Sequence, residues 1–226
     1  MTEQEWLTCT DLTPMLEFLR SKASDRKLRL FAVACCRRIW DLLNDERSRN
    51  AVEVAELAAE GEATDAQISA SAHEAGEVYT AMLAKGIPFD HVEVGATFAA
   101  YFVAVNLIAR TSWAARTAES VSSNAAIASN AAKARNNDGE RNAQAALLRD
   151  IFGNPFRPVT VDPEWLIPTV TFLARIIYEE RSFDQMPDLA DTLEAAGCTN
   201  EDILAHCRIE NHVRGCWVVD LVLGKE

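Results

Sequence analysis

Signals for α-helices recur along almost the entire chain, whereas signals for β-strands are nearly absent, and this constrains the fold more than any other feature. The segment after Ser24 is a clear example, because Ser24 can cap a helix and the apolar residues that follow recur at a spacing close to 3.6 positions. These residues are Leu28, Ala32, Cys35, Ile39 and Leu42. A helix with this spacing has one apolar face, which packs against other helices. The sequence therefore predicts an all-α fold, a helical bundle of about nine helices.

Polar residues that can cap a helix stand where the periodic segments begin. Thr64 and Gln67 form a capping box, because the hydroxyl and the amide can each bond a free backbone N–H group. Asp45 or Ser48 is placed to begin the preceding helix, and Gly61 is placed to end it. These local signals predict where helices start and stop.

Two short helices are predicted near the end of the chain. Thr199 and Asp202 are placed to cap the first of them. The second is predicted from three apolar residues at helical spacing, Val213, Trp217 and Leu221.

The most apolar stretch runs over 94–109 and is interrupted only by Thr97 and Asn106. This is shorter than the ~20 residues that a helix needs to span a bilayer. We therefore expect a central helix of the bundle, buried on all sides, and no membrane partner.

The composition changes over 116–146, where alanine, serine and asparagine replace most large apolar residues. Small side chains permit close helix packing but bury little area. This alanine-rich middle segment is the best candidate for a boundary. We predict an N-terminal helical region over 1–135 and a C-terminal helical region over 140–226, which either form separate cores or share one.

The chain is acidic, with 34 Asp and Glu against 22 Lys and Arg among its 226 residues and a net charge of −12. Nucleic-acid binding depends on Lys and Arg that neutralise phosphates, so this balance argues against DNA or RNA as a partner. The densest basic group is Arg26, Lys27, Arg29, Arg37 and Arg38. We expect it to be a solvated or ion-paired helix face.

The first nine residues lack a basic start followed by an apolar run, so no secretory signal is predicted. We therefore expect a cytoplasmic protein in which the six cysteines stay reduced. Adjacent Cys35 and Cys36 are expected to pack as small apolar residues in the core.

Thiol and imidazole groups are concentrated near the C-terminus, in contrast to the rest of the chain. They belong to Cys198, His206, Cys207, His212 and Cys216. Zinc is usually held by four Cys or His ligands in a tetrahedron. His212 and Cys216 stand four positions apart, which would place them on one face of a helix.

A zinc site could therefore use Cys198, Cys207, His212 and Cys216, with His206 as an alternative to Cys207. The spacing matches no strong zinc signature, and no C-x-x-C pair is present. Packing of these thiols in a core is the preferred interpretation, and a structural zinc site or a reactive thiol is the alternative.

Catalytic motifs are absent from the sequence. It contains no G-x-S-x-G nucleophile motif and no glycine-rich phosphate-binding run. Cys216 with His212 is the only plausible pair of nucleophile and base. The remaining histidines, His73 and His91, are expected to be polar surface residues.

Several stretches of the chain resemble a bacterial family associated with planctomycetes. They are EWLTC at 5–9, SDRKLRLF at 24–31, CCRRIW at 35–40, LRDIFGNPFRP at 148–158 and HVRGCW at 212–217. The resemblance covers both ends of the chain and leaves about 62–146 loosely related. It implies no catalytic residue, substrate or cofactor, because none is established for that family. A variable middle between two distinctive ends is typical of a spacer or an interaction surface.

These observations favour a non-enzymatic helical module that binds a protein partner or acts as a scaffold. One alternative is a metal-stabilised (zinc) or thiol-dependent domain that uses the C-terminal Cys and His residues. Another is a helical hydrolase with a cleft lined by carboxylates, for which Glu179, Glu180 and Asp184 are the candidates.

Overall fold

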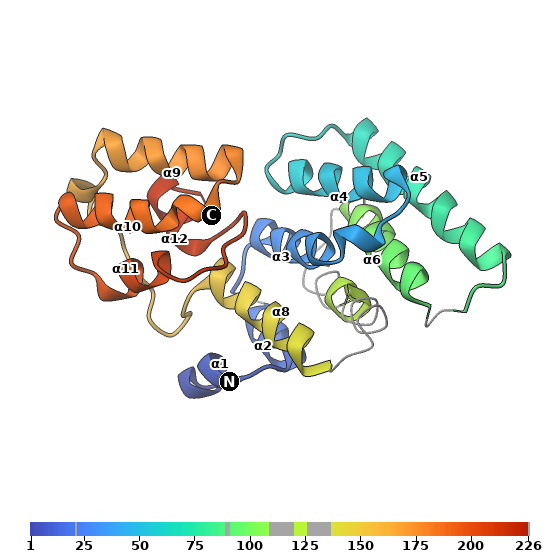
Figure 1. Cartoon of the computed structure of the whole chain (residues 1–226), viewed down its shortest axis with the longest axis horizontal. Coiled ribbons are helices and arrows are strands. Elements are labelled where there is room, and N and C mark those ends of the chain that lie inside the picture. The colour runs from blue at the N-terminus through green and yellow to red at the C-terminus, as the bar shows by residue number, and fades with distance from the viewer. Residues whose placement is uncertain (21, 89–90, 109–119, 126–136, 226) are drawn as a thin grey trace. The chain divides into compact units, whose positions relative to one another are not determined.

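The computed structural model describes residues 1–20, 22–88, 91–108, 120–125 and 137–225, with only the backbone described at 106–108 and 137–138. Within these residues the chain forms helices and no strand, which confirms the all-α fold and the helical bundle (Figure 1). Helices are slightly more numerous than the nine predicted. Two parts of the alanine-rich middle segment, 116–119 and 126–136, lie outside the described residues.

The chain divides into two compact units, Met1–Ala145 and Ala146–Glu226. The division falls within helix α8 (Asn137–Phe152), which therefore contributes residues to both units. The predicted boundary between 135 and 140 lies a few residues before this division. Each unit is described separately below.

The described part of unit 1 contains the helices α1 to α6 and a short 3-10 helix, η1. A helical stretch at 120–125 and the first part of α8 also belong to it. Their bounds are α1 Glu3–Thr8, α2 Leu12–Leu19, α3 Asp25–Arg38, η1 Trp40–Leu42, α4 Glu46–Ala59, α5 Asp65–Ala84 and α6 Val92–Ile108. Three helices begin at a residue predicted to cap them: α3 at Ser24, α4 at Asp45 and α5 at Thr64. The Ser24 hydroxyl accepts the Lys27 N–H, and the Thr64–Gln67 capping box is complete.

Asp45, rather than Ser48, begins α4, because its carboxylate accepts the Arg47 N–H at 3.0 Å. Ser48 lies inside the helix. Gly61 follows the end of α4 with a φ of 76°, a left-handed conformation that glycine adopts without steric cost.

Helices α4, α5 and α6 pack against one another through small residues. Ala51, Ala72, Ala75 and Ala104 form a buried cluster, with Tyr101 packed against it. The α6 helix is buried or half-buried at every position over 94–105, so the apolar stretch forms a central helix, but half-buried positions such as Tyr101 and Val105 show that it is not buried on all sides as expected. Among the described residues, no helix has the length and apolar character needed to cross a membrane.

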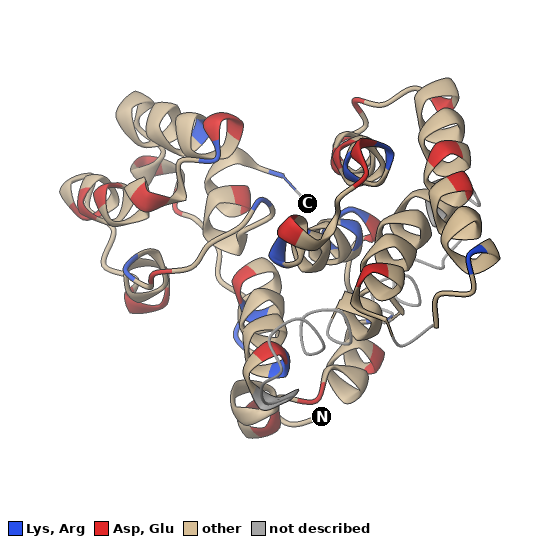
Figure 2. Ribbon diagram, turned by 45° about the vertical axis from the view of Figure 1, so that its right-hand side comes forward, with Lys and Arg blue, Asp and Glu red and all other residues tan. Residues whose placement is uncertain are grey.

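Ion pairs account for much of the basic group in α3. Arg26 pairs with Glu60, Arg37 with Glu56 and Arg38 with Glu140. Acidic residues recur along the helices of both units, with basic residues among them (Figure 2). The expectation of an ion-paired face is confirmed for these three arginines.

Unit 2 consists of the end of α8 and a compact set of helices around one core. Their bounds are η2 Pro163–Trp165, α9 Pro168–Glu180, η3 Phe183–Gln185, α10 Met186–Ala195, α11 Glu201–Cys207 and α12 Trp217–Leu223. The core is built mainly from apolar residues of α9, α10 and α12, and it also contains Cys198, Cys207 and Cys216.

Two local predictions for this unit are wrong. The cap of α11 is Asn200, not Thr199, because the Asn200 side chain accepts the Ile203 N–H at 3.1 Å. The last helix begins at Trp217, not at Val213. Gly215 has a φ of 92°, which is incompatible with a helix through this position, and 211–216 forms a loop instead.

Candidate metal centre

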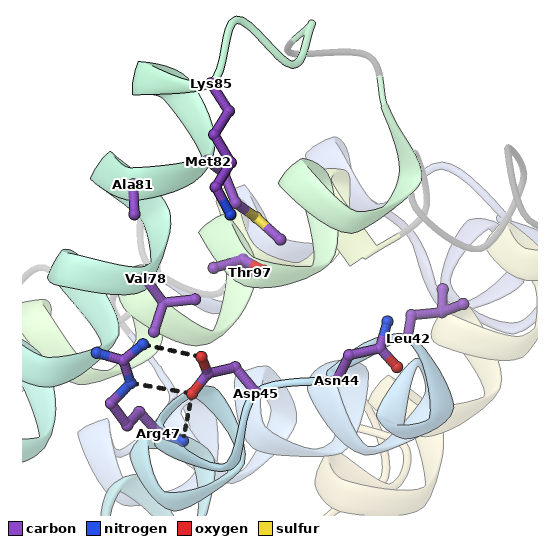
Figure 3. A pocket seen from close by; sticks show the side chains of 9 residues that line it. All are labelled: Leu42, Asn44, Asp45, Arg47, Val78, Ala81, Met82, Lys85 and Thr97. Carbon is purple, nitrogen blue, oxygen red and sulfur yellow. Dashed lines mark hydrogen bonds and ion pairs between the residues drawn. The ribbon is translucent and has the colours of Figure 1, made fainter.

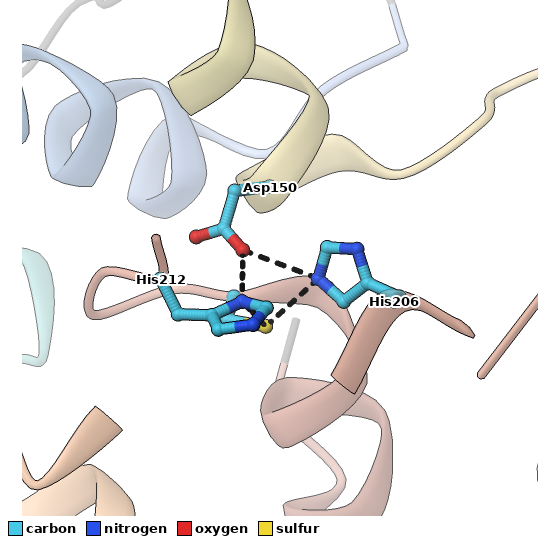
Figure 4. A group of neighbouring side chains, drawn as sticks. Asp150, His206 and His212 are labelled. Carbon is cyan, nitrogen blue, oxygen red and sulfur yellow. Dashed lines mark hydrogen bonds and ion pairs between the residues drawn. The ribbon is translucent and has the colours of Figure 1, made fainter. Parts of the chain in front are cut away.

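Four side chains from three segments of unit 2 converge on one point (Figure 4). Asp150 lies in the last turn of α8, His206 lies in the last turn of α11, and His212 and Cys216 lie in or at the end of the loop before α12. One donor atom of each residue lies within 4.8 Å of the corresponding atoms of the other three.

Individual distances show how closely the donor atoms approach one another. Asp150 Oδ1 lies 2.6 Å from His212 Nδ1 and 3.1 Å from His206 Nε2. Cys216 Sγ lies 3.2 Å from His206 Nε2 and 3.6 Å from His212 Nδ1. Each imidazole therefore presents a single nitrogen to both the carboxylate and the thiol.

These separations resemble the edges of a zinc coordination tetrahedron. Zinc bonds of about 2.0 Å to nitrogen or oxygen and about 2.3 Å to sulfur give edges of about 3.3–3.5 Å. The carboxylate–His212 separation of 2.6 Å is shorter and corresponds to a hydrogen bond. Binding of an ion at this point would require Asp150 and His212 to move apart.

The group is enclosed by protein. The side chain of His212 is 0% exposed, that of Asp150 is 1% exposed and that of His206 is 11% exposed, and Cys216 is buried. A zinc site with four protein ligands and no open position is typical of a structural role, whereas catalytic zinc keeps one position for water or substrate.

Two further contacts orient the ligands. His212 Nε2 lies 3.2 Å from the carbonyl oxygen of Ile209, and the Val213 N–H donates to Asp150 Oδ2 at 2.9 Å. Ligating histidines commonly donate their second N–H group to a carbonyl, which fixes the tautomer and leaves the other nitrogen free to bind a metal. The contacts of His212 follow this pattern.

The charge of Asp150 requires compensation in this setting. Burial would raise its pKa, but the hydrogen bonds and positive charge of His206 and His212 outweigh burial, so the pKa lies below its ordinary value. Its position in the last turn of α8 is also unfavourable for an anion, because the carboxyl end of a helix dipole is negative. An adjacent cation stabilises an aspartate placed here.

Cys216 is a neutral thiol in the absence of a metal. Burial and the negative charge of Asp150 raise its pKa well above the ordinary range, although the N–H groups of Val219 and Val218 act in the opposite direction. A bound divalent cation would convert this thiol to a thiolate and release its proton.

The structure brings together two of the four ligands predicted from the sequence, His212 and Cys216, and adds His206, the predicted alternative. The predicted reason for their proximity is wrong, because the two residues meet across a loop and not on one helix face. Cys198 and Cys207 lie in the apolar core outside this group. Burial and then the neighbouring Cys198 raise the pKa of Cys207 to about 12, as suits a packed thiol.

Asp150 was not predicted as a ligand, and its spacing gives no indication of the role, since it lies 62 positions before His212. One feature of the local sequence could nevertheless have indicated that Asp150 has a charged partner. Leu147, Leu148 and Ile151 are buried in α8, and Asp150 is a buried acidic residue on the same helix. A carboxylate on the apolar side of a helix usually has a charged or metal partner.

The arrangement does not have the geometry of a Cys–His–Asp catalytic triad. In a triad, one imidazole nitrogen contacts the nucleophile and the opposite nitrogen contacts the carboxylate. Here the same nitrogen of each histidine faces both groups. The other carboxylates considered for catalysis, Glu179, Glu180 and Asp184, are exposed.

The other histidines are surface residues as expected: His73 and His91 are both exposed. A cavity of about 280 Å³ in unit 1 is lined by Leu42, Asn44, Asp45, Arg47, Val78, Ala81, Met82, Lys85 and Thr97 (Figure 3). Asp45 and Arg47 are paired with each other in it through two side-chain hydrogen bonds. None of its lining residues belongs to the convergent group around Asp150.

Comparison with protein-family models, with curated protein sequences and with solved structures finds no match to this chain. The resemblance to the planctomycete family stays a prediction.

Proposed function

We propose that unit 2 is a zinc-stabilised, non-enzymatic helical domain in which Asp150, His206, His212 and Cys216 hold one Zn²⁺ ion. The observation that carries this proposal is convergence: one nitrogen of each imidazole, the thiol and one carboxylate oxygen all face the same point. Nitrogen and thiolate ligands with one carboxylate suit zinc, which has no strong geometric preference of its own and is usually four-coordinate.

Charge balance supports a divalent ion. The carboxylate of Asp150 and the thiolate of Cys216 together carry two negative charges, and the two imidazoles are neutral when they bind a metal. One Zn²⁺ ion then makes the buried centre neutral. A neutral centre avoids the large cost of an isolated charge away from water.

The ion would have a structural role. Its ligands come from α8, from α11 and from the loop before α12, so a single ion would fasten three segments that are separate in sequence. Helices α11 and α12 are both short, at seven residues each, and short helices depend on tertiary contacts for stability.

Cobalt substitution tests this proposal. The full chain is stripped of metal and titrated with Co²⁺, which gives visible d–d bands in a tetrahedral site and a near-ultraviolet charge-transfer band when a thiolate binds. We expect both sets of bands to saturate at one ion per chain, and we expect added Zn²⁺ to abolish them.

Matched cysteine variants identify the ligand. Cys216→Ser should remove the charge-transfer band, whereas Cys207→Ser and Cys198→Ser should retain it, because the latter two residues lie outside the convergent group. A wild-type protein that gives no tetrahedral cobalt spectrum, or a Cys216→Ser variant that keeps the thiolate band, would contradict the proposal.

A second candidate function is protein binding by the same unit, which the large apolar residues exposed on α9 favour. Phe172 is 65% exposed, and Ile167 directly before the helix is 39% exposed. Exposed aromatic residues often anchor a partner. If α9 binds a protein, Phe172→Ser should abolish co-purification of that protein without changing the cobalt spectrum; unchanged co-purification would count against a role for α9.

A further inference from the structure

Trp217 contacts the ligand-bearing segments around the centre. It directly follows Cys216 and is the first residue of α12. Its ring centroid lies 5.1 Å from that of His206, with an angle of 49° between the ring planes. The indole is half-buried, so it lies between the core and solvent.

The indole also packs directly on the backbone of Gly153. A Cβ atom at Gly153 would lie 3.1 Å from Trp217 Cγ, closer than side chains normally approach, so the space that a Cβ would need is taken up by the indole. Gly153 ends α8 with a φ of 62°, a left-handed conformation that also favours glycine. It lies in the same helix end as Asp150, so Trp217 touches the segment that supplies the carboxylate.

We propose that Trp217 is a positioning residue that holds His206 and the end of α8 in the ligand arrangement and slows the release of the metal ion. This inference rests on the proposed zinc site. Of the four ligand side chains, His206 is the most exposed at 11%, so it is the one that can swing away from the ion with least disturbance of the core. The indole packed against its ring opposes that motion.

The rate of zinc release measures this effect. The zinc-loaded protein is mixed with an excess of a chelator that changes colour when it binds zinc, and the colour change is followed with time. Residues that orient metal ligands typically change metal affinity or activity by about 10- to 100-fold when replaced, and we expect Trp217→Ala to accelerate release by a comparable factor. Trp217→Phe should restore slow release, because it keeps an aromatic ring beside His206. Trp165→Ala is the matched control, since Trp165 is a half-buried tryptophan of the same core with no ring contact to the centre in the described residues.

Gly153→Ala tests the same contact from the other side. It should also accelerate release, because the new methyl group displaces the indole. Its control is Gly224→Ala in the same unit, which has a closely similar φ of 65° but open space around the added methyl group. The comparison separates displacement of Trp217 from backbone strain. It also keeps the inference testable if Trp217→Ala does not fold.

The cobalt spectrum provides a readout that general destabilisation would not change. Trp217→Ala should shift the d–d bands of the bound ion, and Trp165→Ala should leave them unchanged. Failure of the wild-type chain to bind cobalt would overturn the proposed function itself. Binding by the wild-type chain, with equal release rates and identical spectra for the Trp217 and Trp165 variants, would overturn only the role of Trp217.

Discussion

Asp150 shows how a single residue can depend on partners that are distant in sequence. Its carboxylate is buried, and it bonds to two histidines and one backbone N–H group. The histidines and Val213 come from the last part of the chain, so the ligand set exists only after unit 2 has folded. Removing the charge of this one residue should therefore affect both metal binding and stability.

Asp150→Asn keeps the shape of the side chain and removes its charge, and we expect it to weaken zinc binding by about 10-fold or more. The metal-free proteins should also differ in acid. Because the folded-state pKa of Asp150 is lowered, its contribution to stability is present above the ordinary pKa of 3.8 and is lost as pH falls through the folded-state value. Urea unfolding at several pH values measures this.

In that experiment, the wild-type chain should lose stability below pH 3.8 more steeply than Asp150→Asn, with both proteins free of metal. Parallel pH profiles for the two proteins would mean that the lowered pKa of Asp150 makes no contribution to folding. Equal zinc affinity would remove Asp150 from the ligand set.

At the scale of elements, the sequence predicted most helix starts for which the controlling interaction is local, although it placed the cap of α11 at Thr199 and not at the adjacent Asn200. The caps Ser24, Asp45 and Thr64 bond N–H groups two or three positions away, so their effect can be read from neighbouring residues. The start of α12 could not be predicted in this way. Apolar spacing suggested a helix from Val213, but Gly215 takes a left-handed conformation and the loop is held by the bond from the Val213 N–H to Asp150.

The candidate site was predictable in part for the same reason. The concentration of thiols and imidazoles near the C-terminus pointed to the correct segment and to His212 and Cys216. It could not separate His206 from Cys207, because adjacent residues of a helix point in different directions and only the packing of α11 decides which one faces the centre. The fourth ligand comes from another helix, so no spacing pattern near the cluster contains it.

Elements of unit 1 are joined by a buried ion pair whose contribution can be measured. Arg38 in α3 donates two hydrogen bonds to Glu140 near the start of α8, at 2.8 and 2.9 Å, and the Glu140 side chain is almost fully buried. Glu140→Ala removes one partner and should destabilise the protein by about 2 kcal/mol in urea unfolding, because hydrogen bonds to a charged group are worth about that much and the Arg38 side chain left behind is one-third exposed to solvent.

The double variant Arg38→Met with Glu140→Leu should recover most of that stability, because apolar residues of similar volume often replace a buried pair at little cost. If the double variant were as unstable as Glu140→Ala, the cost would come from lost packing and not from the unpaired arginine.

At the scale of the whole molecule, the chain forms two units with different sources of stability. Unit 1 packs long helices through small residues, as in the contacts of α4 with α5 and α6. Unit 2 uses shorter helices at its C-terminal end, and the proposed ion fastens these to the end of α8. Removal of the metal should therefore affect the two units unequally.

Hydrogen exchange of the amide groups measures this difference. A ligand at 100 times its dissociation constant stabilises the folded state by about 2.7 kcal/mol, and this protection is lost when a chelator removes the ion. We expect faster exchange in α11, α12 and the loop between them, with little change in α4 and α5. Equal acceleration in both units, or none in α11 and α12, would contradict a local structural role for the ion.

The most direct test of the central claim is native mass spectrometry of the untagged protein, purified without chelator and then supplied with one equivalent of zinc. Zinc with two displaced protons adds about 63 Da, and we predict one such addition per chain, lost in acid and absent from Cys216→Ser. A folded wild-type chain that keeps its metal-free mass would contradict the account and would return Asp150, His206, His212 and Cys216 to a hydrogen-bonded group within the core.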